Sequence, residues 1–214
     1  SIDFKKKKNF VSFFLSDGDN IQWMMQDFAS RYYDVPEAED VKMTFGLPVA
    51  TLAMMAPVQF NNLMGLQKQN CSLMEMLGGG YYYVDTYSQD NNRKTNLRVA
   101  AKRLAVSMRQ YQIKLLGIMA MDVKSEAAKE AYQVYVDAND QLEGIVVLQY
   151  SPYAGGEGEV FWVTNKAGYD IPVITVKYSL WDRIHEREGS PDFIASKLKE
   201  EAQEESFSVV CVHA

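Results

Sequence analysis

Two aspartates stand one residue apart where an apolar run ends. The run extends from Phe10 to Leu15, and the segment "SDGDN" with Asp17 and Asp19 follows it. Two carboxyl groups at the end of a buried strand could act as an acid–base pair, bind substrate hydroxyls or hold a cation. Asp19 or Asn20 could instead cap the next helix by accepting hydrogen bonds from its free amides. The calcium-loop pattern D-x-[DN]-x-[DN]-G is not met, because Gly18 occupies its second place.

Three further carboxyl groups could complete an acid–base pair. Cleavage of a glycosidic bond usually needs two carboxyl groups that face each other at roughly 5 to 9.5 Å. Asp122 ends another apolar run, while Glu157 and Glu159 lie in the glycine-rich segment "YAGGEGE". Each also has a structural interpretation, since Asp122 could cap a helix and the glutamates could be solvated loop charges.

A second segment, "LGGGYYYVD" from Leu77 to Asp85, places glycines next to tyrosines. Glycine allows positive φ and a close approach to the main chain. Tyrosine offers a flat apolar face with a hydroxyl group at its edge. The combination suits a polar ligand with flat faces, such as a sugar, but a tight turn that leads into a buried strand has a similar composition.

Apolar runs alternate with helical patterns along nearly the whole chain. Helical spacing or capping residues predict helices from Ile21 to Tyr32, from near Thr51, from Leu97 to Tyr111, after Ser125 and after Ser190-Pro191. The predicted strands are Phe10 to Leu15, Met43 to Val49, Ser72 to Leu77, Lys114 to Met121, Gly144 to Tyr150, Val173 to Tyr178 and Phe207 to His213, with one further short strand from Val160.

This alternation predicts an α/β fold with successive right-handed crossovers and a parallel sheet. We expect an N-terminal arm over residues 1–9 and a single domain over residues 10–214. The domain is expected to be a parallel (β/α) barrel-like structure with seven strands, either closed or incompletely closed. The alternative is an open, doubly wound sheet.

Parallel strands bring their carboxyl ends to one rim, where ligands bind in both of these architectures. Acidic and aromatic residues dominate the predicted strand ends and cations are scarce. Such a rim suits a neutral polyhydroxylated ligand, because carboxylates accept from hydroxyl groups and aromatic faces cover C–H groups. The predicted catalytic acids are Asp17, Asp19 and Asp122. The predicted substrate-binding residues are Asn20, Gly78, Gly80, Tyr81, Tyr83, Asp85, Tyr150, Tyr178 and Trp181; Tyr153 and His213 also fall at strand ends.

Composition argues against several other classes of protein. The net charge is −6, which disfavours a nucleic-acid surface, and Lys5 to Lys8 are interpreted as a solvated arm. No apolar run approaches the roughly 18 residues that span a bilayer. Two histidines cannot make a multi-histidine zinc site or the ligands of a metal-dependent deacetylase, and no G-x-S-x-G elbow exists. "LGGGY" is neither a P-loop nor a dinucleotide fingerprint, so we expect no metal and no cofactor.

The two segments together carry a family resemblance. Gly78, Gly80, Tyr81 and Tyr83 match a G-x-G-Y-x-Y-x-P signature in which Asp85 takes the place of proline, and "LSDGDNIQW" resembles an opening motif of the same group. With "GLPVATLAMMAP" and "PVITVKYSLW", most of the chain resembles the C-terminal domain of the GxGYxYxP putative glycoside hydrolases. The resemblance implies a secreted, periplasmic or cell-surface bacterial protein with an additional N-terminal domain.

Two functional hypotheses follow. In the first, the chain is a carbohydrate-active hydrolase in which one carboxyl group protonates the glycosidic oxygen and an ionised partner acts as base or nucleophile. In the second, it is a non-catalytic carbohydrate-binding or scaffold domain whose acids only cap helices and bind hydroxyl groups.

Overall fold

The elements alternate as the sequence predicts. The computed structural model describes residues 9–16, 21–36, 42–66, 71–77, 80–88, 90–150, 156–181, 188–202 and 206–213. Within these ranges the elements are β1 (Phe10–Ser16), α1 (Ile21–Met24), the π-helix Ala29–Tyr33, β2 (Met43–Leu47), α2 (Val49–Met55), α3 (Pro57–Gly65), β3 (Cys71–Met76), α4 (Arg93–Gln110), β4 (Leu115–Ala120), α5 (Glu126–Ala138), β5 (Gly144–Gln149), β6 (Val160–Thr164), β7 (Asp170–Thr175), β8 (Tyr178–Leu180), α6 (Pro191–Glu201) and β9 (Phe207–His213). Apart from Asn9, the predicted N-terminal arm lies outside the described residues.

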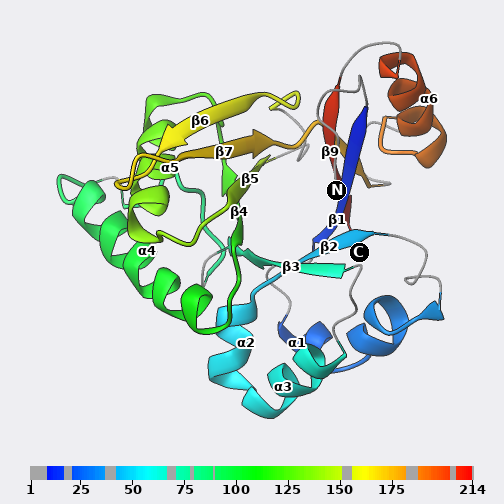
Figure 1. The fold of residues 1–214 in the computed structure, drawn as a ribbon, viewed down its shortest axis with the longest axis horizontal. Coiled ribbons are helices and arrows are strands. Elements are labelled where there is room, and N and C mark those ends of the chain that lie inside the picture. Colours follow the sequence, from blue (N-terminus) through cyan, green and yellow to red (C-terminus); the bar gives the residue numbers. More distant parts are fainter. Residues whose placement is uncertain are drawn as a thin grey trace.

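The described strands form one sheet in the order β6-β7-β5-β4-β3-β2-β1-β9-β8. All neighbouring pairs are parallel except β6 and β7, which are antiparallel. The sheet curls into a half-barrel, with the helices outside the arc of strands (Figure 1). A barrel-like, mostly parallel α/β fold is therefore confirmed.

The predicted count of seven strands is wrong, because the described residues form nine. The short strand from Val160 is part of the sheet as β6, and the predicted strand from Val173 to Tyr178 is divided into β7 and β8. The division occurs where the chain changes partners. The amide of Val176 donates to the Val147 carbonyl of β5 at 3.0 Å, and the next amide, of Lys177, donates to the Val209 carbonyl of β9 at 3.0 Å. Two consecutive residues thus join distant strands of the sheet, which keeps it curled.

Alternating side chains build two cores. Met74 and Met76 belong to a cluster made of strand residues with Leu77 and Val176, whereas Leu73 belongs to a larger cluster that includes the helices. The first cluster therefore fills the concave face of the sheet. Gly117 makes room for it, since a Cβ there would lie 2.3 Å from the Met76 sulfur.

The helix predictions are confirmed where a capping residue marks the start. Ser125 caps α5 by accepting from the Ala128 amide, and Ser190 caps α6 by accepting from the Phe193 amide, with Pro191 in the first turn. The helix predicted from Ile21 to Tyr32 is instead divided into α1 and a π-helix. The helix predicted near Thr51 is two helices, because Pro57 opens a new helix in a position where its missing N–H costs nothing.

Candidate functional site

Three loops meet at the carboxyl ends of β3, β4 and β5. The loop after β3 reaches β4 through a parallel bridge between Tyr83 and Met119, and the Val84 amide donates to the Met119 carbonyl at 2.8 Å. The amide of Tyr150, directly after β5, donates to the carbonyl of Ala120, the last residue of β4, at 2.8 Å. The structure thus brings together the tyrosine loop, the segment around Asp122 and Tyr150.

Tyr81, Tyr83 and Tyr150 form an aromatic group, called here the tyrosine cluster. The ring centroids of Tyr83 and Tyr150 lie 5.0 Å apart, and those of Tyr81 and Tyr83 lie 5.9 Å apart at an angle of 81°. Tyr81 is 48% exposed and Tyr150 is 38% exposed, so aromatic surface of the cluster reaches solvent. Among the described residues, and apart from its chain neighbours, a Cβ on Gly80 would approach only the Tyr82 ring, at 4.0 Å.

Tyr82 lies apart from this cluster. Its hydroxyl group shares a hydrogen bond with the Tyr135 hydroxyl of α5, and its ring centroid is 4.8 Å from that of Tyr87. Burial raises the pKa of the Tyr82 hydroxyl group. Tyr82 therefore anchors the loop to the helical layer, while the residues on either side of it form the cluster.

Asp85, which stands where the family signature has proline, binds main-chain amides. Its two carboxylate oxygens accept from the amide of Met121 at 3.0 and 3.1 Å, and one of them also accepts from the amide of Asp122 at 2.9 Å. Charge-assisted bonds of this kind are stronger than neutral ones. Asp85 thereby ties the tyrosine loop to the loop after β4, and its predicted role in substrate binding stays a prediction.

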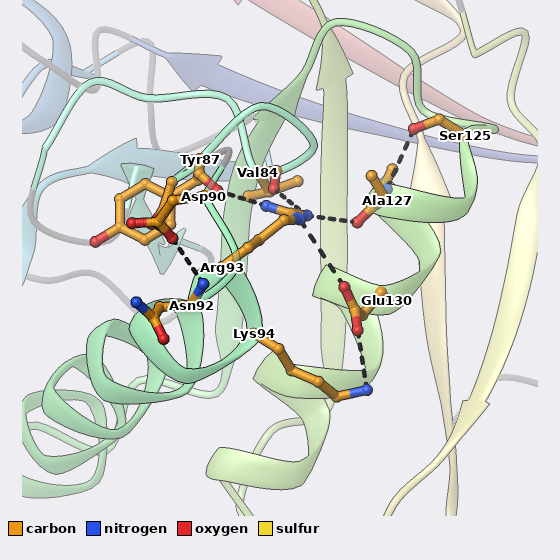
Figure 2. Close-up of polar contacts among 11 residues, drawn as sticks. Val84, Tyr87, Asp90, Asn92, Arg93, Lys94, Ser125, Ala127 and Glu130 are labelled. Atoms are coloured by element: carbon orange, nitrogen blue, oxygen red, sulfur yellow. Dashed lines mark hydrogen bonds and ion pairs between the residues drawn. The ribbon is translucent and has the colours of Figure 1, made fainter.

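Arg93, the first residue of α4, holds the other side of the tyrosine loop (Figure 2). Its guanidinium group donates to the carbonyls of Tyr87 at 2.6 Å, Val84 at 2.8 Å and Ala127 at 2.8 Å. Its Nε also lies 3.9 Å from a carboxylate oxygen of Glu130, and its side chain is only 16% exposed. One side chain thus connects the loop with the first turn of α5.

Sequence reasoning missed Arg93, because the predicted helix begins at Leu97 whereas α4 begins at Arg93. A cation at the start of a helix opposes the helix dipole, and α4 has no acidic residue in its first turn. Arg93 offsets this unfavourable interaction by its contacts with three carbonyl groups and Glu130. Lys94 completes the arrangement with an ion pair to Glu130 at 2.9 Å.

Asp122 lies in the turn before α5 next to other acidic residues. Its Oδ1 accepts from the Lys124 amide at 2.9 Å, and its carbonyl accepts from the Ser125 hydroxyl at 2.8 Å. The Lys124 ammonium group lies 2.8 Å from a Glu159 carboxylate oxygen. The bond to Glu159, with the nearby charges of Glu157 and Asp122, raises the pKa of Lys124. Glu159 therefore pairs with this lysine at the rim, and the charges of Glu157 and Asp122 act on it as well.

The other predicted site residues fall into two groups. Asp17, Asp19, Asn20, Gly78 and Tyr153 lie outside the described residues.

Tyr178 lies in β8, an edge strand of the described sheet, and Trp181 follows it directly. The Tyr178 hydroxyl group bonds to Glu201 of α6, and the Trp181 ring lies 5.1 Å from the ring of His213 at the end of β9.

Glu75 is a buried acid that sequence reasoning also missed. It lies in β3, is fully buried, and its Oε2 accepts from the Ala50 amide in the first turn of α2 at 2.8 Å. Burial raises the pKa of Glu75 to about 8, against the opposing effect of the Ala50 and Val49 amides. The available signal was a carboxyl group inside the apolar strand "CSLMEM".

Among the described residues, no group of three or more His, Cys, Asp or Glu side chains could hold a metal ion. None of the helices in these ranges is both long enough and apolar enough to cross a bilayer.

The fold and site together define an α/β half-barrel with an aromatic and acidic carboxyl rim. Residues 7–214 match the family described as the GxGYxYP putative glycoside hydrolase C-terminal domain, and the chain belongs to this family. The resemblance predicted from the sequence is thereby confirmed.

The fold is also similar to a solved structure. A crystal structure of a putative hydrolase from Bacteroides thetaiotaomicron VPI-5482 matches with a TM-score of 0.80 and 18% identity, over 100% of this chain and 40% of that one. At this identity the likeness concerns the fold, and this chain spans less than half of that protein. Among curated proteins, no sequence matches.

Proposed function

We propose that this chain is a carbohydrate-active domain that binds a saccharide on the tyrosine cluster and takes part in cleavage of a glycosidic bond. The observation that carries the proposal is the position of the cluster. Partly exposed aromatic rings lie at the carboxyl ends of the strands, in loops that adjoin Asp122. Aromatic faces can cover the C–H face of a sugar ring while neighbouring carboxylates accept from its hydroxyl groups. The family and the hydrolase with a similar fold support the reaction class.

In this proposal Asp122 is the ionised partner. Its Oδ1 accepts from the Lys124 amide, which holds the carboxylate in one orientation, as a base or nucleophile requires. The acid that protonates the glycosidic oxygen is Asp17 or Asp19, which follow β1 in the sequence. Glu157 and Glu159 are the alternative acids, because they lie near the same lysine as Asp122.

The test is hydrolysis of a panel of glycosides and polysaccharides by the wild-type chain and the Asp122→Asn variant. Loss of a catalytic carboxylate lowers the rate by about 100-fold or more. Asp140→Asn is the matched control, since Asp140 is an aspartate with an 80% exposed side chain far from the rim. Equal hydrolysis by the wild type and Asp122→Asn would contradict the assigned role.

One observation favours the second candidate, a non-catalytic carbohydrate-binding domain. The carboxylates of Asp85 and Asp122 both accept from backbone amides, as purely structural aspartates do. Replacing Asp17, Asp19 or Asp122 with asparagine distinguishes the two candidate functions. In an enzyme the variant loses hydrolysis, whereas saccharide binding persists both in an enzyme and in a non-catalytic domain. Tyr150→Ala weakens binding about tenfold in both, since it removes one ring of the cluster.

The proposal extends to location and partners. We expect a secreted, periplasmic or cell-surface protein in which an additional N-terminal domain accompanies this chain. The same glycoside panel, applied to the longer polypeptide, measures whether that domain contributes to activity.

A further inference from the structure

Three consecutive amides after β4 donate to side chains that lie outside their own segment. The amides of Met121 and Asp122 donate to the Asp85 carboxylate at 3.0 and 2.9 Å. The Val123 amide donates to the side chain of Gln149 in β5 at 3.3 Å. These amides lie beyond the end of β4, so side chains satisfy main-chain groups that the sheet leaves unpaired.

Asp122 is held by bonds of two kinds. Its Oδ1 accepts from the Lys124 amide at 2.9 Å, and its carbonyl accepts from the Ser125 hydroxyl group at 2.8 Å. These bonds lie within the turn before α5, and they fix the shape of that turn. The bond from the Asp122 amide to Asp85 crosses to another loop, so it fixes the position of the turn.

Asp85 belongs to the loop that carries the tyrosine cluster. Tyr83 lies just before it in the sequence and forms the bridge to Met119 of β4. The Tyr83 ring packs against the Tyr150 ring, with centroids 5.0 Å apart. The Asp85 carboxylate therefore connects the rings proposed to bind the saccharide with the residue proposed to act on it.

The connection depends on the type of residue at position 85. Both carboxylate oxygens accept from the Met121 amide, at 3.0 and 3.1 Å, and one of them also accepts from the Asp122 amide. Charge-assisted bonds to two neighbouring amides define the orientation of the two loops as well as the distance between them. Alanine or proline at this position would offer no side-chain acceptor for these amides.

We infer that Asp85 is a positioning residue of the proposed active site, which fixes the Asp122 carboxylate relative to the tyrosine cluster. The inference rests on the proposed function, in which Asp122 acts as base or nucleophile. Asp85 acts through the main chain of Asp122 and needs no contact of its own with the reacting atoms. A displacement of about 1 Å at a catalytic group can lower a rate by about 100-fold, so loss of this connection lowers kcat.

The experiment measures kcat and KM for a glycoside that the wild type hydrolyses. Asp85→Asn keeps the size of the side chain but loses its charge and one acceptor, so kcat is expected to fall about 10- to 100-fold. KM is expected to change by less than about threefold, because Arg93 still donates to carbonyls of the tyrosine loop. Tyr150→Ala is expected to show the reverse pattern, with KM raised about tenfold and kcat nearly unchanged.

Asp90→Asn is the matched control. Asp90 lies in the segment before α4, and its carboxylate accepts from the Asn92 amide at 2.9 Å (Figure 2). This variant weakens the same kind of bond, from a carboxylate to a main-chain amide, but within one segment instead of between two loops. Its kcat is expected to stay within about twofold of the wild-type value.

Amide hydrogen exchange tests the connection without any turnover. The Met121 and Asp122 amides are expected to exchange at least about tenfold faster in Asp85→Asn than in the wild type, because their acceptor is weaker. The Val84 amide, which donates to the Met119 carbonyl at 2.8 Å, is expected to keep its exchange rate. An unchanged rate at Val84 shows that the tyrosine loop stays folded in the variant.

The outcomes separate this inference from the proposed function. With an active wild type, an unchanged kcat in Asp85→Asn, whether or not KM rises, overturns the inference and leaves the proposed function standing. So does a fall in kcat no larger than that of Asp90→Asn, or exchange of the Met121 and Asp122 amides that Asp85→Asn leaves unchanged. A wild type that hydrolyses no glycoside of the panel overturns the catalytic proposal, and the inference falls with it.

Discussion

At the scale of single residues, the tyrosine loop is held from two sides. Asp85 accepts amides of the loop after β4, and Arg93 donates to carbonyls of the tyrosine loop and of α5. Neither residue belongs to the tyrosine cluster. Both decide where the cluster lies, because they satisfy main-chain groups that the irregular loop leaves unpaired.

Arg93→Ala is expected to lower the free energy of unfolding by about 2 to 4 kcal/mol, because it leaves three carbonyl groups without their donor. Urea denaturation measures this change. Arg98→Ala is the matched control, since Arg98 is an exposed arginine of the same helix, and it is expected to change stability by less than about 0.5 kcal/mol. Equal losses in the two variants would show that Arg93 does not hold the loop.

At the scale of elements, Glu75 joins β3 to the first turn of α2. Its pKa is raised to about 8 in the folded chain, so from about pH 4.5 to 8 the folded state binds a proton that the unfolded state has lost. Stability therefore falls as the pH rises through this range and levels off above it. Glu75→Gln, which cannot ionise, is expected to remove most of this slope.

Urea denaturation at a series of pH values checks this prediction. Near pH 4.5 the variant and the wild type should differ little, and by pH 8 the variant should be more stable by a few kcal/mol. A gap that does not widen with pH would mean that Glu75 titrates normally.

A pair of glycines tests the packing of the elements. A Cβ at Gly117 of β4 would lie 2.3 Å from the Met76 sulfur and 3.0 Å from Met74, whereas a Cβ at Gly65 of α3 would meet no atom of the described residues within 4 Å. Gly117→Ala is expected to destabilise the chain by about 1 to 3 kcal/mol through overpacking. Gly65→Ala is expected to stabilise it by about 0.5 to 1 kcal/mol through lower chain entropy. Thermal unfolding of both variants provides the comparison, and a tolerated Gly117→Ala would contradict the tight concave core.

At the scale of the whole molecule, one segment joins the two arms of the sheet. Val176 bonds to β5 and Lys177 to β9, although five positions separate these strands in the order of the sheet. We expect a single cooperative unfolding transition, because unfolding of the part of the sheet around β5 would also break the hydrogen bond that connects it, through Val176 and Lys177, to the part around β9. The three tryptophans report on α1, β6 and the end of β8, so fluorescence of single-tryptophan variants should coincide with far-ultraviolet circular dichroism. Separate midpoints would show that the arms unfold independently.

The local pattern of the chain determined much of this protein. Apolar runs, helical spacing and the capping residues Ser125 and Ser190 were enough to place most elements, since they act between near neighbours. The glycines and tyrosines from Leu77 to Asp85, combined with the "LSDGDNIQW" motif, were enough to predict the family. The roles of Asp17, Asp19 and Asp122 stay predictions.

Only the tertiary structure decided which distant groups meet. It divided the predicted strand from Val173 to Tyr178 after Val176. The Val176 amide donates to β5, whereas the next amide, of Lys177, donates to β9. It assigned the Asp85 carboxylate to main-chain amides, and it placed Tyr150 rather than Tyr178 beside the tyrosine loop. The type of a residue determines which hydrogen bonds its side chain can donate or accept. Which group becomes its partner depends on the crossover connections and on the register of the strands, and both arise from the packing of the whole chain.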